Sequence, residues 1–67
     1  MEIKVTKEYI TLGQLLKLAD IIQSGGEAKF AVKQLHILVN NISENRRGRK
    51  LYPGDLVEVE GKKIHIV

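Results

Sequence analysis

The residues best suited to site chemistry are five consecutive positions, Arg46-Arg47-Gly48-Arg49-Lys50, which carry four positive charges. The whole 67-residue chain has a net charge of only +3, so the rest of the chain sums to −1. Arginine and lysine side chains bind phosphate oxygens, and each nucleic-acid phosphate that they neutralise releases condensed counterions. The positive charge is concentrated at one place, and nucleic acid is therefore the first partner to consider.

Other kinds of site find little support in the residue types. The chain has no cysteine, which excludes a disulfide and a thiolate metal site, and His36 and His65 are its only imidazoles. No nucleophile stands at a persuasive spacing from a base, and there is no phosphate-loop motif or cluster of metal-ligand residues. We therefore expect a binding protein that is not an enzyme, with no cofactor, no metal and no small-molecule substrate.

The first element that must position the basic residues is a helix predicted from about residue 12 to 22. Thr11 and Gln14 have the spacing of a capping box, in which each side chain bonds to the backbone N–H of the other residue. Apolar residues then follow the helical period at Leu12, Leu15, Leu16, Ala19 and Ile22.

A second helix is predicted soon after the first. Ser24 and Glu27 have the spacing of another capping box. Lys29, Phe30 and Lys33 fall on the side of this helix that is opposite its apolar stripe. The stripe consists of Ala28, Ala31, Val32 and Leu35.

Beyond the second helix the pattern is typical of short strands and turns. Ile37-Leu38-Val39 suits a strand, Asn40-Asn41 suits a turn with positive φ, and Ile42 begins the return strand. Residues 45–50 are predicted to form a loop. Since Ile3 and Val5 suit one more short strand near the start of the chain, both ends of the sequence contribute to a sheet.

The last part of the chain predicts a turn and a closing hairpin. Tyr52-Pro53-Gly54-Asp55 fits a β-turn with proline second and glycine third. The runs 56–60 and 64–67 flank Gly61-Lys62-Lys63 as two hairpin strands. The order of elements predicts a single α+β domain over residues 1–67, with two short helices packed on a small, mainly antiparallel sheet.

This order of elements, together with several motifs, resembles the S4 RNA-binding domain over about residues 11 to 59. The most specific motifs, at the relative spacings of the family, are Ser24-x-x-Glu27-Ala28, Val39-Asn40 and Pro53-Gly54-Asp55. Small free-standing bacterial S4 proteins of the YaaA type are similar through residues 10–14, 23–26 and 45–51. The resemblance implies an αL RNA-binding motif and binding of structured RNA.

The resemblance also implies that the basic loop lies beside the second helix, so that six charges form one RNA-binding face. The six residues are Lys29, Lys33, Arg46, Arg47, Arg49 and Lys50. A-form RNA is bound through its phosphates, its 2′-hydroxyls and its shape, which suits flexible basic side chains. The secondary RNA contacts of the hypothesis are Ser24, Gly25, Gly26, Phe30, Asn40 and Asn41.

Three of these secondary contacts, Phe30, Gly25 and Gly26, have alternative interpretations. Phe30 either stacks on an unpaired base or packs on the N-terminal segment or a neighbouring strand. Gly25 and Gly26 stand where other S4 domains carry basic residues, and they either let a phosphate approach the helix start or simply form a turn between helices.

The expected RNA is ribosomal RNA or a ribosomal particle, with transfer RNA as the other candidate. Charge alone does not separate RNA from DNA, and a module that docks an acidic protein surface is the alternative function. Because the sequence has no cysteine, no long apolar run and no charged-then-apolar start, we expect an unprocessed, soluble, cytoplasmic protein with no membrane partner. We expect a monomer, although open sheet edges offer a route to a dimer.

Overall fold

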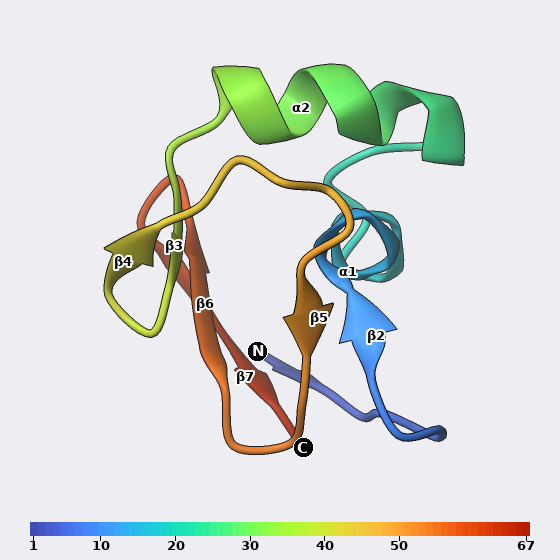
Figure 1. Cartoon of the computed structure of the whole chain (residues 1–67), viewed down its shortest axis with the longest axis vertical. Helices are drawn as coiled ribbons and strands as arrows, with labels where there is room; N and C mark the ends of the chain where they lie inside the picture. Colours follow the sequence, from blue (N-terminus) through green and yellow to red (C-terminus); the bar gives the residue numbers. More distant parts are fainter.

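The computed structural model describes all 67 residues and places two short helices on one face of a sheet (Figure 1). The strands form a five-stranded sheet in the order β1-β7-β6-β3-β4 and a separate two-stranded ladder of β2 and β5. β1 and β7 pair in parallel and every other pair is antiparallel, which confirms the predicted α+β fold with a mainly antiparallel sheet. The elements are β1 (Glu2–Ile3), β2 (Ile10–Thr11), α1 (Leu12–Leu18), the 3₁₀ turn η1 (Gly25–Glu27), α2 (Ala28–Gln34), β3 (Ile37–Val39), β4 (Ile42–Ser43), β5 (Lys50–Leu51), β6 (Leu56–Val59) and β7 (Lys62–Ile66).

Helix α1 begins with the predicted capping box. The Gln14 N–H donates to Thr11 Oγ1 at 3.2 Å, and the Thr11 N–H donates to Gln14 Oε1 at 2.9 Å. The first turn of the helix is therefore fixed by residues that neighbour one another in the sequence.

The predicted end of this helix at residue 22 was wrong, because α1 ends at Leu18. Asp20 adopts a left-handed conformation with φ 60°, its N–H donates to Lys17 O, and the Ile21 N–H donates to Leu16 O. These two bonds form a Schellman motif, which closes the helix. Ile22 is buried although it lies outside the helix. Its apolar side chain fits the helical spacing of the sequence, and this led to the prediction of a longer helix.

The capping box predicted at Ser24 does not form. Ser24 Oγ donates to Glu27 Oε1 at 3.4 Å instead of accepting from the backbone, and residues 25–27 form a 3₁₀ turn before α2 begins at Ala28. Because glycine is a poor helix former, Gly25 and Gly26 favour this short turn over a full helical start.

The exposed and buried sides of α2 are as predicted. Its buried side faces α1 and the core, whereas Lys29, Phe30 and Lys33 are exposed. Leu35 lies just beyond the helix and is only partly buried. The buried residues of the helix are Ala28, Ala31 and Val32.

Two predicted turns are confirmed. Asn40 and Asn41 both have positive φ, 52° and 68°, in the tight hairpin between β3 and β4. At the next turn the Asp55 N–H donates to Tyr52 O at 3.0 Å, and Gly54 has φ 102° at the third position. Both turns use residues that reach positive φ at low cost.

Two strand boundaries differ from the prediction. Lys50 was predicted in a loop but belongs to β5, where it pairs with Thr11 of β2. Strand β7 begins at Lys62, since the hairpin turns at Glu60 and Gly61, which have φ 50° and 84°. The pairing of Lys50 depends on a segment far away in the sequence, so its own neighbours do not predict it.

The core lies between the helices and the covered face of the sheet, and it includes Leu51 of β5, the residue that directly follows the basic segment 46–50. Leu51 is fully buried, so the side chains of Lys50, which precedes it on β5, and of Tyr52, which directly follows the strand, face outward. The two α-helices have seven residues each, and neither has the length or apolarity to cross a bilayer. The buried apolar residues are Val5, Leu12, Leu15, Leu16, Ile22, Ala28, Ala31, Val32, Ile37, Val39, Leu51, Val57, Val59, Ile64 and Ile66.

Candidate nucleic-acid interface

The backbone of the basic loop, residues 45–50, is bound to the first turn of α1. The Leu12 N–H donates to Arg49 O and the Gly13 N–H donates to Arg47 O, both at 2.8 Å. The first N–H groups of any helix lack partners within the helix, and here loop carbonyls supply them. The start of α1 therefore holds the loop in place.

Gly13 lets the loop and both helices meet closely at this point. A Cβ atom on Gly13 would lie 3.2 Å from Ala28 Cβ and 3.4 Å from Arg47 O. The distance to Ala28 Cβ is shorter than an ordinary contact between two carbon atoms, and the distance to Arg47 O is at the short limit of ordinary contact. The lack of a side chain at Gly13 thus allows Arg47 to lie near the start of α2.

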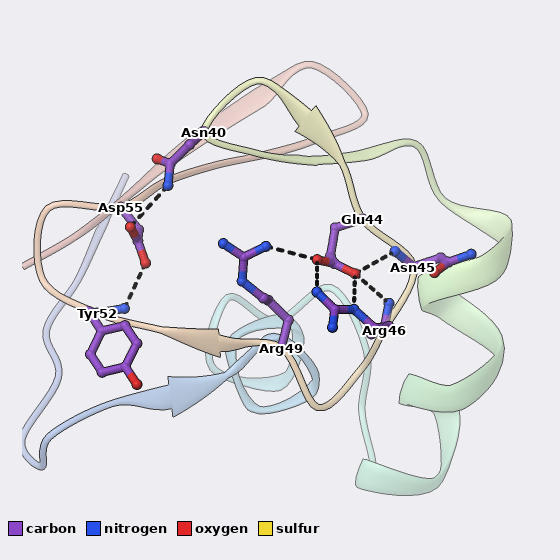
Figure 2. A network of polar contacts seen from close by, with 7 residues as sticks. All are labelled: Asn40, Glu44, Asn45, Arg46, Arg49, Tyr52 and Asp55. Carbon is purple, nitrogen blue, oxygen red and sulfur yellow. Dashed lines mark hydrogen bonds and ion pairs between the residues drawn. The ribbon is translucent and has the colours of Figure 1, made fainter.

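Glu44 lies between the side chains of Arg46 and Arg49 and binds both of them (Figure 2). Its Oε1 accepts from Arg46 Nη2 at 3.0 Å and from Arg49 Nη1 at 2.9 Å, and its Oε2 accepts from Arg46 Nε at 2.9 Å. The backbone N–H groups of Asn45 and Arg46 also donate to Oε2, at 3.2 and 3.1 Å. The Glu44 residue is only 8% exposed, so these five hydrogen bonds satisfy a largely buried carboxylate.

Hydrogen bonding from Arg46 is the main cause that lowers the pKa of Glu44 from 4.5 to about 2. Burial acts in the opposite direction, and the Arg49 hydrogen bond lowers the pKa further. Glu44 is therefore ionised at neutral pH and cancels one of the four positive charges of the loop. The Arg46 side chain nevertheless remains 70% exposed, and that of Arg49 remains 33% exposed.

The other two cations of the loop, Arg47 and Lys50, form no ion pair. Arg47 lines a hollow that it shares with Lys17 of α1 and Gly25 of η1. Lys50 lies on the outer side of β5, with its Nζ 4.9 Å from the centre of the Tyr9 ring. These two side chains are the loop cations most available to a ligand.

The structure brings part of the predicted face together. Arg46, Arg49 and Lys50 line one open hollow, while Lys29 and Lys33 stand on α2 and line neither this hollow nor the one at Arg47. Phe30 is 61% exposed, and the Lys29 Nζ lies 5.5 Å from the centre of its ring. Ala28, the first residue of α2, lies near the loop, whereas Lys29 and Lys33 do not line either hollow.

The residues predicted as secondary contacts differ in whether their side chains already form hydrogen bonds within the protein. Ser24, Gly25 and Gly26 are exposed, and Gly25 lies in the hollow beside Arg47. The Asn40 side chain is occupied, because it donates to Asp55 Oδ1 at 3.0 Å and accepts from the Leu56 N–H at 2.9 Å. The Asn40 side chain thus ties the β3–β4 turn to the start of β6.

Sequence analysis missed three residues of this surface, which are Glu44, Lys17 and Tyr9. An acidic residue two positions before an arginine is a weak signal for Glu44, because its burial depends on the folded loop. Lys17 stands three residues after Gln14, and therefore on the same side of α1 as the capping box. Tyr9 had no local signal, since it meets Lys50 only through the β2–β5 pairing.

Comparison with known proteins finds a matching family and a similar bacterial protein. The model of a family described as the S4 domain matches residues 3–67, which include both helices, the basic loop and every strand from β2 onward. A protein of Bacillus subtilis (strain 168) that bears the name "Probable ribosome maturation protein RlbA" is 61% identical over 59 residues. The aligned part is 88% of this chain and 83% of that relative.

Proposed function

This chain belongs to the S4 domain family, and from that premise we propose that it binds structured ribosomal RNA without catalysing a reaction. The S4 domain is an RNA-binding domain, which sets the class of ligand. The observation that carries the proposal is the basic loop itself, fixed by the first turn of α1 and by the buried carboxylate of Glu44. A loop that is ordered before binding loses less entropy when a phosphate backbone meets it.

The proposed contacts divide the loop cations into two kinds. Arg47 and Lys50, which form no ion pair, neutralise phosphates directly. Arg46 and Arg49 are oriented by Glu44, and their remaining N–H groups donate to phosphate oxygens or 2′-hydroxyls. The planar guanidinium groups thereby gain a fixed direction that a flexible surface arginine lacks.

Residues outside the loop extend the proposed face. Lys29 and Lys33 add point charges along α2, and Lys17 adds one in the hollow at Arg47. Because the Phe30 ring is exposed beside Lys29, it is available to stack on a base. Backbone and side-chain atoms at Ser24, Gly25, Gly26, Asn40 and Asn41 complete the set as secondary contacts.

A ribosomal particle is the proposed target in the cell. The Bacillus subtilis relative is named as a probable ribosome maturation protein, and its identity to this chain is high over most of both lengths. Ribosomal RNA offers A-form duplexes and phosphate-lined junctions to a small basic domain. We accordingly propose a cytoplasmic location, and we favour ribosomal RNA over transfer RNA.

Gradient centrifugation of a cell lysate tests this proposal. We expect the chain to migrate with ribosomal particles, and to move to the top of the gradient after ribonuclease treatment. The double variant Arg47→Ala/Lys50→Ala should also move toward the top. Lys62→Ala/Lys63→Ala removes the same charge from the β6–β7 hairpin, where the two lysines line a separate hollow with Met1, and should stay with the particles.

Three results would contradict the proposal. The first is migration of the untreated chain at the top of the gradient. The second is an equal shift of both double variants, which would reduce the loop to a general charge effect. The third is co-migration that persists after ribonuclease, which would support docking on a protein surface instead.

A further inference from the structure

We propose that the outer side of β5 holds one unpaired nucleotide of the RNA, with its base stacked on Tyr52 and its phosphate bound by Lys50 and Arg46. The inference rests on the RNA binding proposed above and names the part of the RNA that this hollow takes. The hollow is lined by Arg46, Gly48, Arg49, Lys50, Tyr52 and Asp55, of which one is hydrophobic.

Tyr52 offers a ring that is supported on one side and accessible on the other. The residue is 41% exposed, and the centre of its ring lies 5.9 Å from that of Tyr9 at an interplanar angle of 52°. Tyr9 directly precedes Ile10 and Tyr52 directly follows Leu51, so the two tyrosines stand next to the antiparallel Ile10–Leu51 pair and project from the side opposite to it. A ring held in this way loses little freedom when a flat ligand stacks on it.

The turn after β5 fixes the position of Tyr52 as well. Asp55 Oδ2 accepts from the Tyr52 N–H at 2.8 Å, and Asp55 Oδ1 accepts from Asn40 Nδ2 at 3.0 Å (Figure 2). Both oxygens of this carboxylate therefore have donors within the protein. Asp55 serves to hold the wall of the hollow, and the side chains left to meet a ligand are cationic or aromatic.

The combination of charge and aromatic surface selects a nucleotide as the ligand. Lys50 lies beside the tyrosine pair, with its Nζ 4.9 Å from the Tyr9 ring centre, and Arg46, whose side chain is 70% exposed, lines the same hollow as Lys50 and Tyr52. A phosphate and a base are adjacent in a nucleotide, and every base has a face that can stack on an aromatic ring. In a duplex those faces are covered by neighbouring pairs, so only an unpaired base can reach Tyr52.

A binding comparison between two RNA hairpins tests the inference. The hairpins have the same stem, and one of them carries a single unpaired nucleotide in the stem. We expect the protein to bind the hairpin with the unpaired nucleotide about tenfold more tightly than the fully paired one. Tyr52→Phe should keep this preference because it keeps the ring, whereas Tyr52→Leu should lose the preference and keep its affinity for the paired hairpin.

A second measurement does not depend on any variant. With 2-aminopurine as the unpaired base, binding of the unmodified protein should quench its fluorescence as the base stacks on the ring. Absence of quenching, absence of a preference, or a preference that survives in folded Tyr52→Leu would overturn the inference and leave RNA binding in place. Failure to bind either hairpin would overturn the proposed function, and this inference with it.

Discussion

The side chain of Glu44 accepts hydrogen bonds from two arginine side chains and two backbone N–H groups while it is only 8% exposed. Without this carboxylate, the neighbouring guanidinium groups of Arg46 and Arg49 would repel each other and their chains would move freely. With it, the loop presents its arginines in one arrangement. The role of Glu44 is therefore to position other side chains.

The variant Glu44→Gln should lower the free energy of unfolding at pH 7 by about 1 to 2 kcal/mol. The folded pKa of about 2 lies below the ordinary value of 4.5, so the ionised form stabilises the fold. Because the Arg46 side chain is 70% exposed, solvent screening reduces the effect below the value given by the pKa difference alone. Urea unfolding at pH 7 measures this loss.

The same residue sets a pH dependence. A lowered pKa gives stability that is fully present above about pH 5 and is lost as the pH falls toward about 2. The decrease in unfolding free energy from pH 7 to pH 3 should thus be smaller in Glu44→Gln than in the unmodified protein. Glu8→Gln changes the same charge at an exposed residue with no hydrogen-bonding partner and should keep the full decrease. Equal decreases in all three proteins would refute the role of Glu44.

At this scale the sequence predicts the cations but not their pairing. A run of four basic side chains within five positions is visible without a structure, and so is its preference for phosphate. That two of the four share one buried carboxylate is not visible, because Glu44 becomes buried only when the loop folds back over it.

At the scale of elements, the end of α1 determines how the chain reaches α2. Asp20 occupies the left-handed position of the Schellman motif with φ 60°, a position where glycine is most common. An L-residue with a Cβ atom is strained there, although aspartate tolerates it better than most. The helix therefore stops at a residue that has no strong stop signal in the sequence.

Asp20→Gly should raise the free energy of unfolding by about 0.5 to 1 kcal/mol, because glycine reaches positive φ without that strain, and this gain outweighs the loss of the exposed hydrogen bond from Gln23 Nε2 to Asp20 Oδ1. Asp20→Ala should lower it by about 1 kcal/mol, since alanine has the Cβ strain and loses the hydrogen bond from Gln23 Nε2 to Asp20 Oδ1. Thermal or urea unfolding of the two variants gives the comparison. If the Asp20→Ala variant proved as stable as the Asp20→Gly variant, strain at the left-handed position would not contribute to the stability of the protein.

The contrast between the two ends of α1 explains which elements sequence analysis predicts well. The capping box at Thr11 lies within four consecutive residues, so the helix start is encoded locally and was predicted. The β2–β5 ladder pairs residues 10 and 11 with 51 and 50, and no local pattern reports such a pairing. The prediction of Lys50 as loop failed for this reason.

At the scale of the whole molecule, the fold separates two basic regions. The loop cations lie around the start of α1 and the outer side of β5, whereas Lys62 and Lys63 lie with Met1 and Ile21 at another hollow. The fold class and the S4 family were predictable because the order of elements and the turn motifs span most of the chain. The distance of Lys62 and Lys63 from the loop cations was not predictable, since it depends on how the strands of the sheet are arranged in space.

This separation allows a matched test of the central claim that the basic loop binds RNA phosphates. Arg47→Ala/Lys50→Ala removes the two unpaired loop cations and leaves the Glu44 ion pairs intact. Lys62→Ala/Lys63→Ala removes an equal charge elsewhere. Replacing Arg46 and Arg49 as well would leave the buried Glu44 carboxylate without its cationic partners and would confuse an effect on binding with an effect on stability.

The measurement is the dependence of RNA affinity on salt concentration for the unmodified protein and both double variants. Each phosphate contact contributes about 0.7 to 0.9 to the slope of log K against log salt. The account predicts a slope lower by about 1.4 to 1.8 for Arg47→Ala/Lys50→Ala, and an unchanged slope for Lys62→Ala/Lys63→Ala. An unchanged slope for the loop variant, or an equal decrease for both, would contradict it.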